Sequence, residues 1–134
     1  MTVASCQERT PYEDCYFDRI VAVYVMEEHL TVLPRAVPEL HRILRVGGIF
    51  SIVIPCDPGI AYEFARKISS ERIFRRRYKM PYMWLMRREH VNSPAEIMSV
   101  MKNGFEKKER TIFPLDMVPI VSANLCVGIT YRRL

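Results

Sequence analysis

The sequence lacks any long hydrophobic run, and no apolar stretch approaches the roughly 18 residues that a membrane span needs. Its beginning, MTVASCQERTPYEDC, has no basic region followed by an apolar one, so we expect no secretory signal peptide. The four cysteines are scattered, with no C-x-x-C pair and no spacing typical of a disulfide framework. We therefore expect free thiols, a cytoplasmic location and no membrane association.

Internal repeats and low-complexity segments are also missing. The 134 residues suffice for one domain with a hydrophobic core, and hydrophobic residues make up 49% of the chain against 26% charged residues. These proportions are typical of soluble globular proteins and argue against disorder. We expect a single domain over residues 1–134.

The net charge of +5 comes from one stretch of the chain. Seven basic residues lie between Glu71 and Glu89, interleaved with Phe, Tyr and Trp, and the rest of the chain is neutral. This basic, aromatic insert, residues 70–92, has three interpretations. It binds an anionic substrate, it contacts single-stranded nucleic acid through arginines and stacking rings, or it is a cap whose rings pack while its arginines stay solvated. The nucleic-acid interpretation is the least favoured.

The first half of the chain predicts a strand, a helix and a second strand. Residues 17–26 read as a strand buried on both faces. The next apolar residues have helical spacing, and Pro34 and Pro38 suggest that the regular helix begins only at 35–37. Gly47 is predicted to end this helix with a positive φ, and residues 49–54 to form the second strand. This order is a right-handed βαβ crossover.

The second half predicts two more helices and an antiparallel pair of strands. Residues 60–68 have a helical stripe, and Ser93, Pro94 and Glu96 predict a capped helix that ends at Gly104. Residues 105–115 form a highly charged strand, which suggests a sheet edge, and 122–133 alternate as the last strand. The fold class is α/β, with four strands in the order first, second, last, then 105–113, and with the last strand antiparallel to the first two.

Three segments resemble class I S-adenosylmethionine-dependent methyltransferases of the small-molecule type. These are TPYEDCYFDRIVAVYVMEEHL, LPRAVPELHRILRVGGIFSIVIP and the closing FEKKERTIFPL…ANLCVGITYRR. They match only the C-terminal half of that domain, and the family's glycine-rich cofactor loop and ribose-binding acid have no counterpart. The resemblance implies a partial Rossmann-like sheet with flanking helices, S-adenosyl-L-methionine as cofactor and a small-molecule acceptor. It also implies that this chain alone is inactive.

Ligands of open α/β sheets bind beyond the carboxyl ends of the strands. In this chain those ends are the segments 24–29 and 55–57, after the first and second strands. With the resemblance, this places the cofactor at Cys6, Gln7, Tyr24, Met26 and Glu27. The end of the second strand, together with the insert above the expected substrate site, gives the substrate-binding candidates Cys56, Asp57, Tyr82, Arg87 and His90. The weak candidates for a catalytic base are His29 and His90. No metal site is expected, because the successive residues 27–29 project in different directions.

A non-catalytic role is the main alternative. The chain would then be a truncated or partner-binding module that self-associates, or pairs with a complementary chain, through its exposed first strand. A second alternative is a nucleic-acid-binding module that uses the basic segment 71–89.

Overall fold

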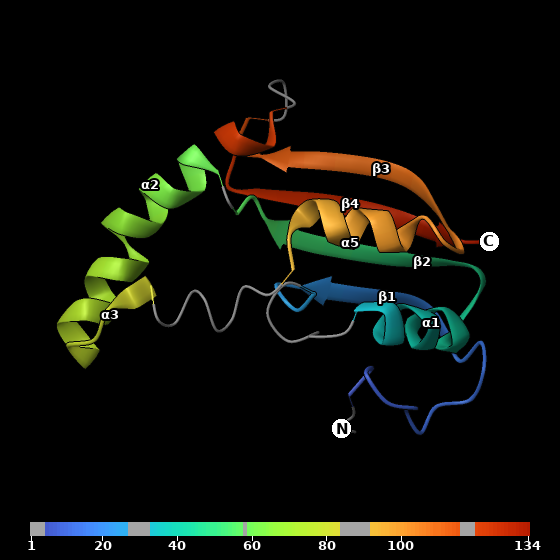
Figure 1. The fold of residues 1–134 in the computed structure, drawn as a ribbon. Helices are drawn as coiled ribbons and strands as arrows, with labels where there is room; N and C mark the ends of the chain where they lie inside the picture. The colour runs from blue at the N-terminus through green and yellow to red at the C-terminus, as the bar shows by residue number, and fades with distance from the viewer. Residues whose placement is uncertain (1–4, 27–32, 58, 84–91, 116–119) are drawn as a thin grey trace.

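The computed structural model describes residues 5–26, 33–57, 59–83, 92–115 and 120–134. Figure 1 shows one sheet, two helices on one of its faces and a helical arm that extends from one end. The arm consists of residues 60–83. In chain order the elements are β1 (Phe17–Val23), α1 (Leu33–Ile43), β2 (Leu44–Pro55), α2 (Ile60–Ile68), α3 (Ser70–Tyr78), α5 (Pro94–Met101), β3 (Phe105–Phe113), the 3-10 turn η1 (Val121–Ala123) and β4 (Cys126–Arg133).

The four strands lie in the order β1-β2-β4-β3. β1 and β2 are parallel, whereas β4 runs antiparallel to both of its neighbours, β2 and β3. This confirms the predicted strand order, including the charged strand at the edge. The antiparallel β4 between two strands that run the other way is the most specific topological feature of the sheet.

The core lies on one face of the sheet, beneath α1 and α5 (Figure 1). Alternate residues of β2 and β4 point into it, and Val127, Ile129 and Tyr131 are buried as their alternation predicts. The opposite face has no such cover: Val21 and Val23 of β1 are 60% and 50% exposed. The prediction that the first strand is buried on both faces is therefore wrong, because the described helices that pack on the sheet cover only one face.

The join between α1 and β2 differs from the predicted one. α1 begins at Leu33 and keeps Pro38 inside it, because its buried apolar stripe outweighs the hydrogen bond that a proline cannot donate. The helix ends at Ile43 and β2 starts at the next residue, so Gly47 lies inside the strand rather than at a helix end.

The two glycines form a bulge in β2. Phe17 pairs with Leu44 but Arg19 pairs with Ile49, so β2 has three extra residues there. Gly47 has the predicted positive φ, +76°. A Cβ on Gly48 would lie 2.8 Å from the carbonyl oxygen of Arg45, which backbone packing does not permit. Gly47 is therefore favoured by its backbone conformation, and Gly48 by the lack of space for a side chain.

The capped helix is confirmed by its hydrogen bonds. The Ser93 hydroxyl accepts from the backbone N–H of Glu96, and the Glu96 carboxylate accepts from the backbone N–H of Ser93. α5 ends at Met101, three residues before the expected Gly104, which instead has a positive φ of 90° in the following turn.

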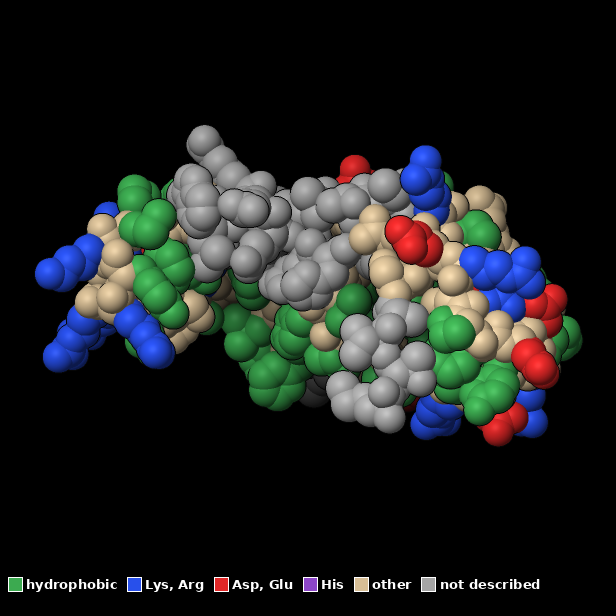
Figure 2. Space-filling view, turned by 90° about the horizontal axis from the view of Figure 1, so that it is seen from below, with side chains coloured by type: hydrophobic (Ala, Val, Ile, Leu, Met, Phe, Trp, Pro, Cys, Tyr) green, Lys and Arg blue, Asp and Glu red, His purple; other side chains and the backbone are tan. Residues whose placement is uncertain are grey.

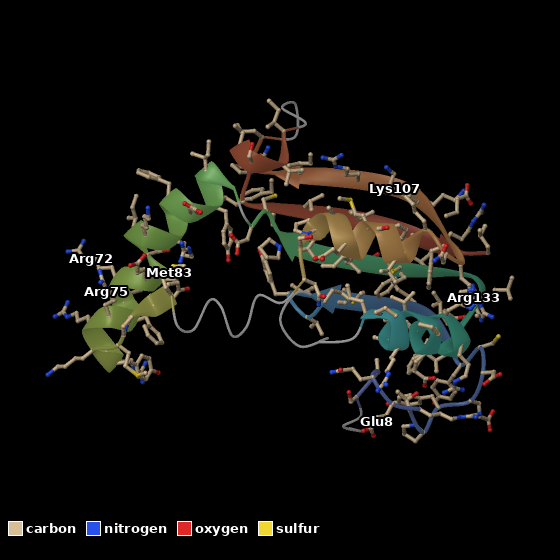
Figure 3. All side chains as sticks on the ribbon, viewed as in Figure 1. Glu8, Arg72, Arg75, Met83, Lys107 and Arg133 are labelled. Atoms are coloured by element: carbon tan, nitrogen blue, oxygen red, sulfur yellow. The ribbon has the colours of Figure 1, made fainter. Side chains whose placement is uncertain are left out.

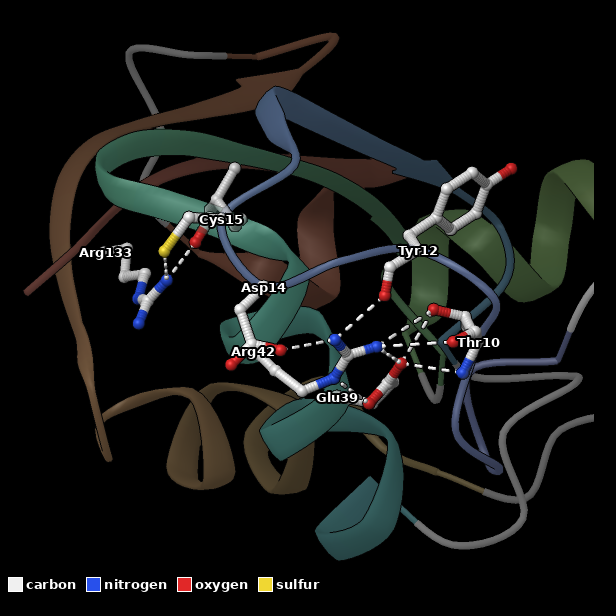
Figure 4. A network of polar contacts seen from close by, with 8 residues as sticks. Thr10, Tyr12, Asp14, Cys15, Glu39, Arg42 and Arg133 are labelled. Carbon is white, nitrogen blue, oxygen red and sulfur yellow. Dashed lines mark hydrogen bonds and ion pairs between the residues drawn. The ribbon is translucent and has the colours of Figure 1, made fainter.

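An ionic network fixes the N-terminal segment against α1 (Figure 4). The Glu39 carboxylate accepts from the backbone N–H and hydroxyl of Thr10 at 2.8 and 2.7 Å. Arg42 donates to Glu39 at 2.6 and 2.9 Å, to Asp14 at 2.6 Å and to the Tyr12 carbonyl at 2.9 Å. The hydrogen bond from Arg42 is the main cause that lowers the pKa of Glu39 to about 2.

We expect Gly47→Ala to lower the free energy of unfolding by about 1 kcal/mol, because an L side chain is disfavoured at positive φ. Gly128→Ala is the matched control: its Cβ would meet the Ile52 and Thr111 carbonyl oxygens at ordinary distances of about 4 Å. Chemical denaturation measures both variants. Equal stabilities of the two would show that the bulge does not require a left-handed residue.

The Glu39 network predicts a loss of stability in acid. Its folded pKa of about 2 lies below the ordinary 4.5, so its stabilisation is complete above pH 4.5 and disappears as the pH falls towards 2. The loss should be no more than about 3 kcal/mol. Denaturation curves at several pH values should show a larger decline in the natural chain than in Glu39→Gln, in which only other paired carboxylates such as Glu96 and Glu106 contribute. Parallel declines in the two proteins would contradict the prediction.

Candidate functional site

β1 and β2 both end on the side of the sheet that faces the helical arm (Figure 1). Parallel strands bring their carboxyl ends to the same edge, which is where open α/β sheets bind ligands. Tyr24 follows β1 directly, and Cys56 and Asp57 follow β2. These three residues form the floor of the candidate site.

The backbone after β1 is held in an unusual conformation. Tyr24 has a φ of 52°, in the left-handed region that bulky residues rarely occupy, and its N–H donates to the Val53 carbonyl at 3.0 Å. Met26 is buried, and its carbonyl accepts a hydrogen bond from the Asn92 side-chain amide at 2.8 Å. The chain beyond β1 is thus fixed at two points, while the Tyr24 side chain remains 42% exposed. Backbone strain of this kind is frequent at functional sites.

Cys56 and Asp57 have different places at the end of β2. Cys56 is completely buried in the hydrophobic core, and its N–H donates to the Leu125 carbonyl at 2.9 Å. Burial is the main cause that raises the pKa of its thiol, so the cysteine supports the site from below and is unreactive. Asp57 is half-buried and lies near the hydroxyl of Tyr62 on α2.

α2 presents two different faces. Its predicted apolar stripe is exposed, because Ile60, Phe64 and Ile68 have 81%, 66% and 56% of their surface accessible. The opposite face carries Tyr62 and Arg66, which are four residues apart and therefore adjacent on the helix. The helix was predicted correctly, but its polar and aromatic face is the more buried one.

Tyr62 links the arm to the ends of the strands. Burial, followed by the charge of Asp57, raises the pKa of the Tyr62 hydroxyl to about 12. Tyr24, Tyr82 and Arg66 are its other electrostatic neighbours. Residues from the ends of β1 and β2, from α2 and from the basic insert therefore all act electrostatically on the Tyr62 hydroxyl, and Arg66 of α2 also packs on Tyr82 of the insert at 5.4 Å.

The rings of the basic insert pack on one another. Phe74 lies 4.9 Å from the Tyr78 ring and 5.3 Å from the Tyr82 ring, and the Arg66 guanidinium lies 5.4 Å from the centre of Tyr82. By contrast, Arg72 and Arg75 point away from the sheet at the outer side of the arm (Figure 3). This arrangement agrees with a cap whose rings pack while its α3 arginines stay solvated.

The side of the molecule beside the β1 edge is rich in exposed apolar surface (Figure 2). Apolar side chains are visible on the arm and on the neighbouring part of the body, whereas Lys and Arg side chains project from the outer end of the arm (Figure 2). The exposed apolar residues of β1 and α2 include Val21, Val23, Ile60, Phe64 and Ile68.

Some of the predicted site residues meet, and others do not. Tyr24, Asp57 and Tyr82 all act electrostatically on Tyr62, whereas Met26 and Cys56 are buried in the hydrophobic core. Cys6 lies elsewhere, in a hollow that includes Phe17 and Ile20, next to Gln7 in the N-terminal segment. The predicted site residues that lie outside the described part of the chain are Glu27, His29, Arg87 and His90.

Sequence reasoning missed Tyr62 and Arg66. Their signal is the spacing of four residues on a helix that begins just after Asp57, on the face opposite the apolar stripe. The apolar stripe predicted that the other face of α2 would be buried. Within the described ranges, no group of three or more metal-ligating side chains occurs. No helix in that same part of the chain has the length and hydrophobicity to span a membrane.

Comparisons with known proteins agree with this geometry. The family described as "Methyltransferase domain" matches residues 1–52. Geranyl diphosphate C-methyltransferase from Streptomyces coelicolor A3(2) superposes with a TM-score of 0.64 at 14% identity, over 99% of this chain and 52% of that one. The fold is that of a class I methyltransferase.

Two further methyltransferases share this fold at similarly low identity. The N-methyltransferase NodS from Bradyrhizobium japonicum WM9 has a TM-score of 0.53 at 16% identity, over 97% of this chain and 57% of that one. A possible histamine N-methyltransferase from Thermotoga maritima has a TM-score of 0.58 at 19% identity, over 98% of this chain and 62% of that one. The chain thus spans little more than half the length of these methyltransferases, and no curated protein matches it.

The Tyr62 environment can be tested spectroscopically. We expect the absorbance difference at 295 nm between the natural chain and Tyr62→Phe to titrate near pH 12, about two units above free tyrosine. Absorbance read milliseconds after a pH jump precedes alkaline unfolding. A difference that titrates near pH 10 would show that the Tyr62 hydroxyl is solvated and that α2 does not close against Asp57.

Proposed function

We propose that this chain is the C-terminal part of an S-adenosylmethionine-dependent methyltransferase that acts on a small molecule. The observation that carries the proposal is the sheet: two parallel strands end at one edge, and an antiparallel β4 separates β2 from β3. The methyltransferase superpositions cover this sheet, and two such structures are complexes with S-adenosyl-L-homocysteine.

The described residues fit one side of a cofactor and acceptor site. The exposed ring of Tyr24 and the fixed backbone after it offer a surface for the cofactor, which supplies the methyl group on its sulfonium. Asp57 and Tyr62, which interact electrostatically, would face the acceptor. Methyl transfer needs chiefly the alignment of nucleophile, methyl group and sulfur, and a rigid floor of two strand ends supplies that alignment.

The acceptor is proposed as a small molecule reached beneath the arm. One similar structure is a geranyl diphosphate C-methyltransferase and another is a possible histamine N-methyltransferase, so the shared fold accommodates different nucleophiles. The acceptors named for these enzymes are small molecules, whereas the rings of Phe74, Tyr78 and Tyr82 pack partly on one another. We therefore favour a small acceptor over nucleic acid.

The open β1 edge requires a complementary polypeptide in this proposal. β3, the other edge, carries a run of charged residues that discourages further pairing. β1 instead exposes Val21 and Val23 beside its unpaired side. We propose that a polypeptide with a parallel strand and the glycine-rich cofactor loop pairs there and completes the site. A purely non-catalytic module that pairs through this edge is the second candidate, supported by the same two valines.

Calorimetry with S-adenosyl-L-homocysteine tests the division of the site between two parts. The 134-residue chain alone should show no micromolar binding, because most cofactor contacts come from the complementary part. The matched sample mixes it with a polypeptide that carries the first three strands and the glycine-rich loop of a class I methyltransferase. This sample should bind, and Tyr24→Ala should weaken that binding.

Two results would contradict the proposal. Micromolar binding by a monomer of this chain, roughly 8 kcal/mol, would show that it carries the site itself. A stable complex with the complementary polypeptide that binds no cofactor would favour the non-catalytic module. Sedimentation of each sample establishes which species is present.

A further inference from the structure

The arm contains one arginine whose environment differs from that of all the α3 arginines. Arg66 is only 9% exposed, although it belongs to a helix with an exposed apolar stripe. Its guanidinium lies over the Tyr82 ring, and Nη1 lies 3.8 Å from the Met83 sulfur. Its Nε is buried and has no hydrogen-bond partner among the residues that the structure describes.

A buried guanidinium with an unused donor is energetically costly. Removing the charge from water is unfavourable, and a cation–π contact offsets only part of that cost. A thioether sulfur is a weak acceptor and adds little. No carboxylate in the described ranges forms an ion pair with Arg66. The site therefore lacks a negative partner that would satisfy Nε.

Two other described arginines differ from Arg66 in their surroundings. Arg133 also has a buried Nε, but its Nη1 donates to the Leu44 carbonyl, and it lies at the opposite end of the sheet (Figure 3). Arg75 is exposed and pairs with Glu71 at 3.6 Å. Arg66 is instead buried against the Tyr82 ring and acts electrostatically on Tyr62, which follows Asp57 by five residues.

We propose that Arg66 binds an anionic oxygen group of the methyl acceptor, a carboxylate or a phosphate, on the arm side of the site. This inference rests on the proposed function and assigns the acceptor a charge. The planar guanidinium suits either group, because Nε and one Nη donate in parallel to two oxygens. The anion subsite thus lies on α2, rather than on the exposed arginines of the segment 71–89.

The Arg66 Nε–H resonance reports this binding directly. We expect titration of the 134-residue chain with sodium phosphate or sodium acetate to shift this resonance saturably, whereas sodium chloride at equal ionic strength does not. Saturation by phosphate but not acetate identifies a phosphate acceptor, and the reverse identifies a carboxylate. No cofactor is present, so this result is independent of S-adenosyl-L-homocysteine binding.

Variants locate the effect. Arg66→Lys keeps the charge but loses the parallel donors, so anion-induced thermal stabilisation should weaken at least fivefold, and Arg66→Met should abolish it. Arg75→Met, on the exposed side of the arm, should leave the stabilisation unchanged. If Arg66→Met does not fold, the shift of the Nε–H resonance in the natural chain and the anion-induced stabilisation of Arg66→Lys still test the proposal. The absence of a saturable shift with both anions, or an equal loss in Arg75→Met, would overturn the proposal.

Discussion

The pairing of β2 with both β1 and β4 is the constraint on which the rest of the structure depends. β2 is hydrogen-bonded in parallel to β1 and antiparallel to β4. Its register therefore positions β1 and β4 directly, and β3 through β4. Its alternate residues Phe50, Ile52 and Ile54 are buried beneath α1 and α5. The same register brings Tyr24 and Asp57 to one edge, and α2 follows directly from that edge. The candidate site is therefore a consequence of how β2 is paired.

The sequence predicted local elements well where one physical rule dominated. The Ser93–Glu96 capping box, the positive φ of Gly47 and the alternation along β4 follow from backbone and burial rules that act within a few residues. The bulge in β2 was not predicted, because glycine at a helix end and glycine in a strand bulge have the same signature. The exposed face of β1 was missed, because a buried strand and an apolar edge strand have similar composition.

Only part of the candidate site was predicted, because only part of it depends on local rules. Tyr24 and Asp57 could be located because strand ends are visible in the sequence. Tyr62 and Arg66 could not, because their burial depends on how the arm meets the sheet, which is a tertiary property. Arg66 also shows why a run of charged residues is a poor guide to a site. The run 71–89 contains seven basic residues, but the described arginines with a buried, unpartnered Nε, Arg66 and Arg133, lie outside it.

The central claim is that β1 is an open edge at which the cofactor site is incomplete, and amide hydrogen exchange tests it most directly. The Tyr24 N–H points to β2, so the alternation of a strand directs the amides of Val21 and Val23 outward. In the monomeric chain these two amides should exchange at least about a hundredfold faster than those of Ala22 and Tyr24. Equal protection of all four amides in a monomer would show that β1 is already covered, and would contradict the account.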